Sequence, residues 1–175
     1  MDRDGTLIED KEYLSRPENV APLAGAAEAL LSLQKAGFKL FVVTNQSGVG
    51  RGFFSLEDVR RVNERLTGLL AGQGVRLEKF YVAPEAPGQP SRGRKPSPQF
   101  LFDARDQFAL DLPASCLIGD KLSDLQCGWN AGLKKCLLVR TGYGRKLEEE
   151  MPRLLRAAVV VDDLPAAAKW ILEAA

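Results

Sequence analysis

The sequence contains no histidine, which removes the most common general base and the most common zinc ligand from consideration. Any acid–base chemistry must therefore come from carboxylates, lysine or water. Cysteine is also scarce, and the three that are present lie far apart, form no CxxC pair and have apolar or helix-like surroundings. We expect Cys116, Cys127 and Cys136 to be buried free thiols in a reducing cytosol.

Neither an excess of charge of one sign nor a long apolar run is present. The chain has 24 basic and 23 acidic residues, so its net charge of +1 does not steer it toward nucleic acid or an anionic membrane. No apolar run is long enough to span a bilayer, and the first residues, MDRDGTLIEDKEY, are too acidic and polar for a signal peptide. We expect a cytoplasmic monomer that binds a small polar ligand, with no nucleic acid or membrane partner.

Short β-branched runs alternate with longer amphipathic stretches, a pattern typical of an α/β fold. The run at residues 38–43 is almost continuously apolar, as expected of a parallel strand covered on both faces. The composition and length predict one domain over residues 1–175, with a parallel sheet between layers of helices. Strands are predicted at residues 38–43, 79–82, 116–119, 135–139 and 159–161, and helices at residues 23–35, 55–70, 97–108, 122–131 and 164–174.

Three of the predicted helices have clear local boundary signals. Gly37 follows the first helix and is typical of a C-terminal cap. Ser55 and Asp58 resemble a capping box at the start of the second. Ser97 and Pro98 predict a capping hydroxyl and a proline at the first position of the third.

Four polar segments lie where predicted strands end or where a loop meets a helix. Open α/β sheets bind ligands at the carboxyl ends of their strands, so we expect the four to converge. In the first segment, Asp2 and Asp4 point to the same side by the two-residue period, and Gly5 lets the chain turn away. Paired carboxylates favour a divalent cation, because unscreened like charges would raise one pKa. Taken alone, the segment is equally consistent with a polar turn.

The second and third segments carry hydroxyl, amide and cationic groups. Thr44 begins the Thr-Asn-Gln-Ser-Gly run, whose hydroxyls and backbone N–H groups could hold a phosphate oxygen, although an ordinary turn has the same composition. Arg94 and Lys95 follow the proline- and glycine-rich loop that starts at residue 83. They could bind a phosphoryl group, or they could simply be solvated.

The fourth segment follows the strand predicted at residues 116–119. Asp120 at the end of this strand is suited to completing an oxygen coordination shell. Asp124 is a further candidate ligand, but it is equally suited to the first turn of the next helix.

In this order, the four segments resemble the signature motifs of haloacid dehalogenase-like phosphatases, and the resemblance spans nearly the whole chain. The finer details, Asp-Arg-Asp-Gly-Thr, Thr-Asn-Gln-Ser-Gly and Arg-Lys-Pro, resemble the D-glycero-D-manno-heptose 1,7-bisphosphate phosphatases, with histidinol-phosphate phosphatases as close relatives. The resemblance implies a Rossmann-like parallel sheet with a minimal cap. It also implies a magnesium-dependent phosphomonoesterase that acts on a small phosphorylated metabolite such as the heptose bisphosphate.

The resemblance also implies roles for individual residues. Asp2 would attack phosphorus and form an aspartyl phosphate, while Asp4 would protonate the leaving oxygen and then activate water. Magnesium would be held by the Asp2 and Asp120 carboxylates and the Asp4 carbonyl, with Asp124 as a further candidate. Thr44 and Lys95 would complete the catalytic set, and the implied substrate-binding residues are Asp10, Lys11, Glu12, Tyr13, Asn45, Gln46, Ser47, Arg94 and Lys121.

Two features depart from the family pattern. The family often binds a structural zinc in the long loop, but the matching positions here are Ala83, Glu85, Ser91 and Gly93, so we expect no zinc and a loop ordered by its prolines or mobile. In addition, only Met1 precedes the first motif, where a buried strand is expected. With a truncated first strand, Asp2 would lie on a frayed end, and we expect the natural protein to begin several residues upstream.

Other functions remain open at this stage. The changed loop leaves histidinol phosphate as an alternative substrate. Polynucleotide 3′-phosphatases carry similar segments, but the balanced charge lacks the basic stripe expected of a nucleic-acid enzyme. A catalytically silent binding module is the alternative from another class, and the presence of all the candidate catalytic residues argues against it.

Overall fold

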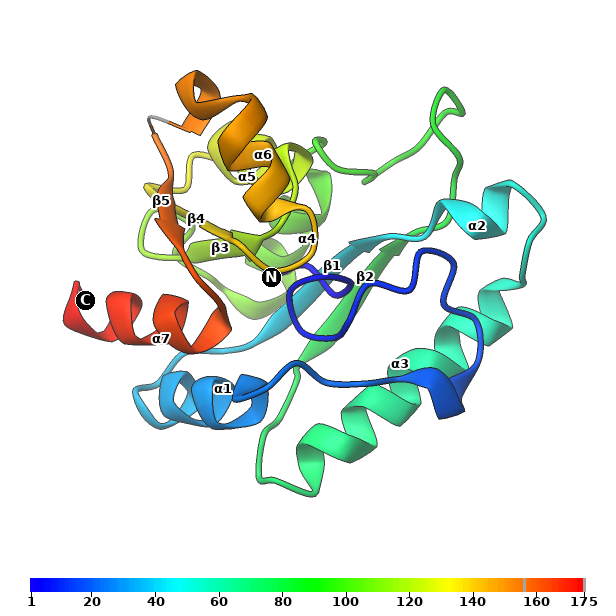
Figure 1. Cartoon of the computed structure of the whole chain (residues 1–175), viewed down its shortest axis with the longest axis horizontal. Coiled ribbons are helices and arrows are strands. Elements are labelled where there is room, and N and C mark those ends of the chain that lie inside the picture. The colour runs from blue at the N-terminus through cyan, green and yellow to red at the C-terminus, as the bar shows by residue number, and fades with distance from the viewer. Residues whose placement is uncertain (156, 175) are drawn as a thin grey trace.

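The strands of the computed structural model, which describes residues 1–155 and 157–174, run parallel within each sheet. One sheet pairs β1 with β2, and the other has the order β3-β4-β5 (Figure 1). Their bounds are β1 Phe41–Asn45, β2 Lys79–Ala83, β3 Cys116–Gly119, β4 Lys135–Val139 and β5 Val159–Val161. The parallel α/β architecture expected from the sequence is confirmed.

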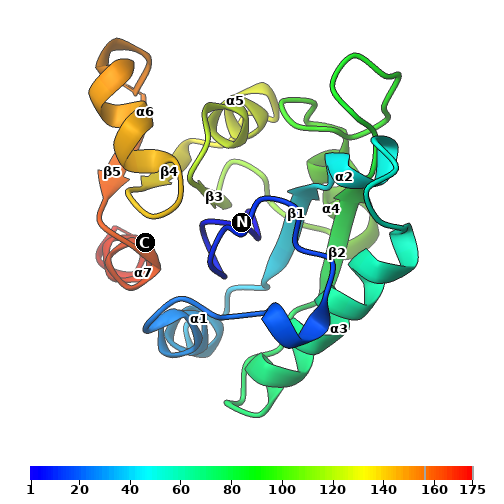
Figure 2. The ribbon, with the colours of Figure 1, turned by 45° about the vertical axis from the view of Figure 1, so that its right-hand side comes forward.

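The backbone of the first two residues joins the two sheets. The Met1 amino group donates to the Phe41 carbonyl at 2.9 Å, and the Val43 amide donates to the Met1 carbonyl at 2.9 Å. On the other side, the Asp2 amide donates to the Ile118 carbonyl at 2.9 Å. The N-terminal segment therefore lies between β1 and β3, near the middle of the molecule in Figure 2. Asp2 is therefore held from both sides. The expectation that it would lie on a frayed end is wrong.

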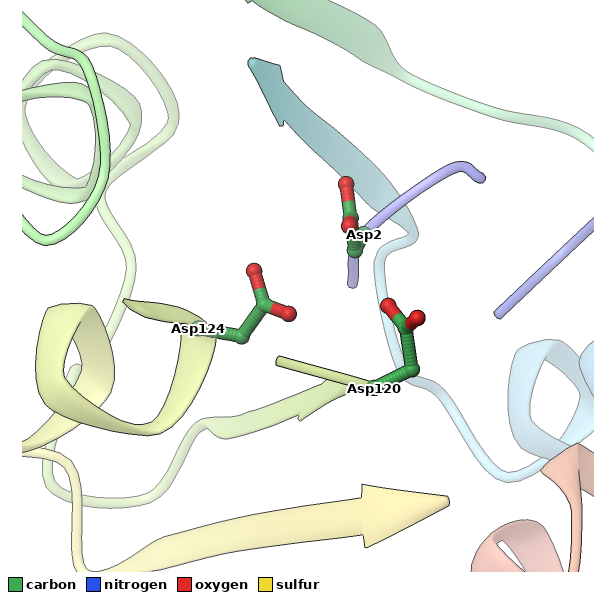
Figure 3. Close-up of side chains that lie close together, drawn as sticks. All are labelled: Asp2, Asp120 and Asp124. Atoms are coloured by element: carbon green, nitrogen blue, oxygen red, sulfur yellow. The ribbon is translucent and has the colours of Figure 1, made fainter. Parts of the chain in front are cut away.

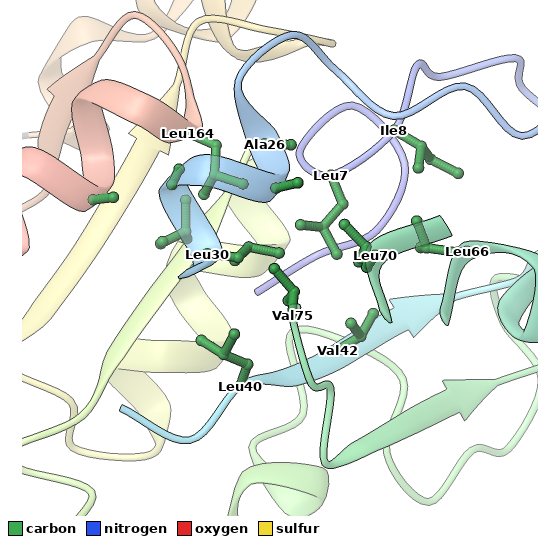
Figure 4. Close-up of a cluster of buried hydrophobic side chains, with 14 of the residues drawn as sticks. Leu7, Ile8, Ala26, Leu30, Leu40, Val42, Leu66, Leu70, Val75 and Leu164 are labelled. Carbon is green, nitrogen blue, oxygen red and sulfur yellow. The ribbon is translucent and has the colours of Figure 1, made fainter. Parts of the chain in front are cut away.

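Layers of helices cover the two faces of the strands. Strand residues alternate between two apolar clusters: Val42 and Ile118 belong to one, while Val43 and Leu117 belong to the other. The first cluster, shown in part in Figure 4, includes residues of α1, α3 and α7, and the second includes residues of α4 and α5. The helices are η1 Pro17–Asn19, α1 Ala26–Lys35, α2 Ser47–Gly50, α3 Leu56–Ala71, α4 Gln99–Phe108, α5 Leu122–Asn130, α6 Gly144–Glu150, η2 Pro152–Leu155 and α7 Leu164–Glu173.

Local signals explain some boundaries better than others. The capping box of Ser55 and Asp58 is confirmed, with hydrogen bonds in both directions. The prediction for α4 is wrong by one position, because Pro98 occupies the cap and Ser97 accepts only a 3.3 Å bond from Gln99. The first helix starts at Ala26 rather than at residue 23, after Gly25 in a left-handed conformation. None of the helices described is long and apolar enough to cross a membrane.

Candidate active site

A polar pocket of about 410 Å³ opens at the carboxyl ends of β1 and β3, on either side of the N-terminal segment. The chain passes from this segment to β1 on one side and later to β3 on the other, which is the arrangement that creates a binding crevice in open α/β sheets. The pocket brings together most of the predicted site residues: Asp2, Asp4, Asp10, Glu12, Tyr13, Thr44, Asn45, Gln46, Ser47, Arg94, Lys95 and Lys121.

Lys11 is the predicted binding residue that does not line this pocket. Its ammonium group donates to the Asn19 carbonyl at 3.0 Å and lies 3.5 Å from the Glu9 carboxylate on the exposed surface. Its neighbour Glu12 adopts a left-handed conformation, with φ of 58°, and its amide donates to Asp10. This turn directs Asp10, Glu12 and Tyr13 to the pocket, whereas Lys11 lies outside it.

The Asp2 carboxylate is fixed in a buried position at the base of the pocket. Its Oδ1 accepts a hydrogen bond from the Arg3 amide at 2.7 Å and lies 2.8 Å from the Lys95 ammonium. Burial alone would raise the pKa of Asp2, but the charges of Lys95 and Lys121 outweigh it and hold the pKa below its usual range. Asp2 is therefore ionised and oriented, as a nucleophile must be.

Lys95 connects Asp2 with a second carboxylate. Its ammonium group lies 2.5 Å from Asp124 Oδ1 and donates to the Val43 carbonyl at 2.7 Å. Burial opposes its charge, but the carboxylates of Asp124 and Asp2 prevail and raise the pKa of Lys95 above its usual value. Its backbone is fixed as well, because Asn45 accepts from the Lys95 amide at 3.0 Å and donates to its carbonyl at 3.1 Å.

Asp2, Asp120 and Asp124 form a buried acidic cluster. One ligand oxygen from each lies within 4.8 Å of the others, and Figure 3 shows the three side chains close together. Burial first, and then the charge of Asp2, raises the pKa of Asp120 to about 7. Within the described part of the chain, Asp120 Oδ1 is buried without a hydrogen-bond partner. An oxygen-rich, over-negative site with an unpaired oxygen fits a hard cation such as magnesium.

Two glycines make room for the Asp120 carboxylate. A Cβ atom at Gly5, where φ is +79°, or at Gly142 would collide with Asp120 Oδ2. The same oxygen accepts a 2.9 Å hydrogen bond from the Tyr143 amide, and Thr141 Oγ1 donates to the Gly5 carbonyl at 2.6 Å. The turn after β4 therefore helps to hold Asp120 against the first motif.

The Asp4 carboxylate lies outside the acidic cluster and has cationic and amide partners of its own. Arg3 donates to both of its oxygens, from Nε at 3.1 Å and from Nη2 at 3.0 Å. The Gln46 amide nitrogen donates to Asp4 Oδ2 and to Thr44 Oγ1, each at 2.8 Å. The structure thus assigns the Asp4 carboxylate to a hydrogen-bonded network, and only its backbone carbonyl remains a candidate for metal binding.

The long loop before Lys95 contains several hydrogen bonds between its own residues. Ser91 Oγ donates to Glu85 Oε2 at 2.7 Å and accepts from the Arg94 amide at 3.1 Å, while Arg94 Nη1 donates to the Glu85 carbonyl at 2.9 Å. The loop also packs closely on α2, where a Cβ atom at Gly50 would collide with Ala86. Polar side chains at two positions where the family often carries zinc ligands, Glu85 and Ser91, therefore bind each other.

Lys121 forms the opposite wall of the pocket. Its ammonium group donates to Asp10 at 3.1 Å, lies 3.8 Å from Asp120 Oδ2 and sits 4.8 Å from the centre of the Tyr143 ring. Arg94 and Lys121 both line the pocket, so two cationic side chains from different segments face the space above Asp2.

Comparison with known proteins matches this chain to one group of enzymes. Residues 93–167 match the family model described as HAD-hydrolase-like. The D-glycero-beta-D-manno-heptose-1,7-bisphosphate 7-phosphatase of Photorhabdus laumondii is 36% identical over 178 residues, which cover 98% of this chain and 94% of that protein. The chain belongs to the haloacid dehalogenase-like phosphatase family.

Further members of the family match over nearly their whole length. The D-glycero-D-manno-heptose-1,7-bisphosphate 7-phosphatase of Chlorobaculum tepidum is 37% identical over 185 residues, which cover 98% of this chain and 92% of that protein. The crystal structure of the D,D-heptose 1,7-bisphosphate phosphatase of B. bronchiseptica, complexed with magnesium and phosphate, has a TM-score of 0.90 at 31% identity. The match covers 99% of this chain and 97% of the B. bronchiseptica chain.

The haloacid dehalogenase-like fold and the class of phosphoric monoester hydrolases are thus confirmed. Sequence reasoning missed other residues of the site. Ser123, Phe54 and Tyr143 line the pocket, and Arg3 lies directly beneath Asp4 in the hydrogen-bonded network. The Thr-Gly-Tyr-Gly run that ends at residue 144 follows a predicted strand, so the rule that located the other segments would have found it.

Proposed function

We propose that this chain is a magnesium-dependent phosphomonoesterase that hydrolyses a sugar bisphosphate of the heptose 1,7-bisphosphate type through an aspartyl phosphate on Asp2. The observation that carries the proposal is the Lys95 ammonium group, which lies between Asp2 and Asp124, two carboxylates of the acidic cluster, at the base of a polar pocket. The names of the relatives matched over nearly the whole chain support the substrate class.

In this mechanism, Asp2 attacks phosphorus in line with the leaving oxygen. A covalent intermediate divides one difficult displacement into two easier ones. Lys95 keeps the carboxylate ionised and balances the charge of the phosphoryl oxygens, to which the Thr44 hydroxyl donates a hydrogen bond. These roles follow from the positions of Lys95 and Thr44 around Asp2. Contacts with the Arg3 amide and with Lys95 hold the Asp2 carboxylate fixed.

Asp4 transfers the protons. It donates a proton to the leaving sugar oxygen and later accepts one from the water that attacks the aspartyl phosphate. Asp4 lines the pocket with its carboxyl group held by Arg3 and by Gln46, so the part of the group that faces the pocket is open to exchange a proton with substrate and water.

The acidic cluster would hold the metal. We assign the carboxylates of Asp2 and Asp120 and the carbonyl of Asp4 as its ligands, with Asp124 beside them. When bound, magnesium neutralises charge that develops on the transferring phosphoryl group.

The upper part of the pocket would bind the rest of the substrate. Arg94 and Lys121 offer cationic groups to a second phosphate, and Ser47 and Asp10 offer hydrogen bonds to sugar hydroxyls. Short segments surround the opening, and the described residues contain no inserted cap domain that would close it.

The test is phosphate release from a panel of four phosphate esters in the presence of magnesium. The panel comprises D-glycero-D-manno-heptose 1,7-bisphosphate, a hexose monophosphate, histidinol phosphate and an oligonucleotide with a 3′-phosphate. We expect the heptose bisphosphate to have the highest kcat/KM, and Asp2→Asn to lose turnover on every substrate. Equal rates for wild type and Asp2→Asn would contradict the assignment of Asp2 as the nucleophile. Faster turnover of another ester than of the heptose bisphosphate would overturn the proposed substrate class.

A further inference from the structure

Arg3 is the residue between the two aspartates of the first motif, and its side chain is fully buried. A buried arginine is unfavourable unless its charge and donors are satisfied. Its fork binds both Asp4 oxygens, and its remaining terminal nitrogen, Nη1, donates to Asn63 Oδ1 at 2.9 Å. Arg3 therefore connects Asp4 to a residue 60 positions away in the chain.

Asn63 lies in the middle of α3, outside the pocket that holds the catalytic groups. It is almost fully buried, and its neighbour Thr67 donates to the Asn63 carbonyl at 2.8 Å. Helices favour residues other than asparagine at interior positions. The side-chain oxygen of Asn63 nevertheless faces the guanidinium group, so this polar position on an amphipathic helix is used to fix Arg3.

The contacts determine the orientation of the Asp4 carboxylate. A planar guanidinium that binds two carboxylate oxygens also sets the plane of the carboxylate. Gln46 adds a donor to Oδ2 at 2.8 Å, which opposes rotation about the Cβ–Cγ bond of Asp4. A proton donor must be held to within a fraction of an ångström and about 10–20° of its productive geometry. The network from α3 to the pocket restrains the carboxylate in the way that this requirement demands.

We infer that Arg3 and Asn63 are positioning residues for Asp4: the Asn63 side chain orients the Arg3 guanidinium, which aims the Asp4 carboxylate at the leaving oxygen. This inference rests on the proposed function, in which Asp4 protonates that oxygen. It differs from a purely structural role, in which Arg3 would only neutralise a buried carboxylate and Asn63 would only fill space.

The experiment compares an ester that needs protonation with one that does not. A sugar alkoxide is a poor leaving group, while p-nitrophenolate leaves without a proton. The value of kcat/KM reports steps up to release of the leaving group, so it excludes the later attack of water. We define the ratio as kcat/KM for heptose 1,7-bisphosphate divided by kcat/KM for p-nitrophenyl phosphate.

Asn63→Leu removes the acceptor with little change in volume, and Arg3→Lys removes the two-point contact but keeps the charge. We expect each to lower the ratio about tenfold, a part of the ~10² to 10⁴ that general acid catalysis contributes. Asn63→Asp keeps an acceptor oxygen and should restore the ratio to within about twofold of wild type. Thr67→Val, one turn along α3, loses a hydrogen bond without touching Arg3 and should leave the ratio unchanged.

Asp4→Asn separates failure of this inference from failure of the proposed function. A reduced ratio in Asp4→Asn but not in Asn63→Leu or Arg3→Lys would overturn the positioning role alone. An unchanged ratio in Asp4→Asn would overturn the acid role on which it rests. If Asn63→Leu does not fold, Arg3→Lys decides, and equal losses on both esters in that variant would count as a structural role and contradict the inference.

Discussion

Asp2 and Asp4 lie two residues apart, yet they belong to halves of the site that differ in charge. Asp2 shares Lys95 with Asp124 and faces Asp120, so carboxylates outnumber nearby ammonium groups in this acidic half. Asp4 is paired one to one with Arg3 and receives a further amide donor, so the paired half is neutral and satisfied. The acidic half requires a cation, whereas the paired half is complete without one.

This difference explains how one short motif can supply two kinds of chemistry. The nucleophile needs a nearby cation that keeps it ionised and screens the incoming phosphoryl group. The proton donor must be held in a fixed orientation and must reach the leaving oxygen of the substrate. Environment, rather than residue type, therefore separates the roles of the two aspartates.

The largest effect is expected from breaking the acidic half at Lys95. Lys95→Met leaves buried carboxylates without their shared cation, so the free energy of unfolding should fall by about 3–5 kcal/mol. Phosphate release should fall by about 10³-fold. Urea unfolding and steady-state kinetics measure the two losses. Lys121→Met is the control for stability alone, since this side chain is 37% exposed and its loss should lower the free energy of unfolding by about 1 kcal/mol or less.

The two halves should respond in opposite directions to loss of a carboxylate charge. Without magnesium, Asp4→Asn leaves Arg3 buried and unpaired and should lower the free energy of unfolding by about 3 kcal/mol. Asp120→Asn relieves repulsion, because the pKa of Asp120 is raised to about 7 by burial and by Asp2, and should raise it by about 1–2 kcal/mol. Urea unfolding above pH 7 tests both. The same sign of change in the two variants would contradict the distinction between the halves.

Magnesium should stabilise the protein through the acidic half alone. At a concentration of ~100 times its Kd, it should add about 2.7 kcal/mol and raise the midpoint of thermal unfolding by about 5–10 °C. The increase should persist in Asp4→Asn and disappear in Asp120→Asn, with sodium chloride of equal ionic strength as the control. If Asp124 helps to hold the magnesium ligands in place, Asp124→Asn should weaken magnesium affinity by about 10–100-fold. Unchanged affinity would mean that Asp124 only caps α5 and pairs with Lys95.

The smallest effect is expected at the rim, where the loop holds Arg94. Glu85→Ala removes the acceptor of Ser91 and should raise KM for the bisphosphate about threefold with kcat unchanged, because the loop acts on binding. Gln73→Ala, on the exposed surface after α3, is a control that should change neither constant. A fall in kcat without a change in KM would mean that the loop acts on the chemical step.

Short-range patterns predicted much of the fold. The strand at residues 79–82, the capping box at Ser55 and the strand at Cys116–Gly119 depend on local alternation or on contacts three residues apart, and the structure agrees with them. The helix α6 (Gly144–Glu150) was missed, because its Gly-Arg-Lys-Leu-Glu-Glu-Glu sequence has no apolar stripe. Its position depends on packing against the turn after β4, and a local sequence pattern cannot predict such packing.

The sequence predicted which residues converge where strands end, but not which side chains reach across the fold. Convergence of Asp2, Thr44 and Asp120 follows because β1 and β3 end on either side of the N-terminal segment. The two-residue period treats Arg3 as pointing away from Asp4, but its long side chain turns back to bind the Asp4 carboxylate and reaches Asn63 on α3. Such a contact depends on the docking of a helix 60 residues later, so spacing within the motif could not reveal it.

The central claim, that Asp2 becomes phosphorylated while Asp4 transfers protons, has one direct test. Asp4→Asn is mixed with p-nitrophenyl phosphate and magnesium, quenched in acid within milliseconds, digested and examined by mass spectrometry. Because the leaving group needs no proton but hydrolysis of the intermediate needs Asp4 as a base, the phosphorylated enzyme should accumulate, with the phosphate on the N-terminal peptide at Asp2. A phosphate on any other residue, or continued turnover without a phosphorylated Asp2 peptide, would contradict the account.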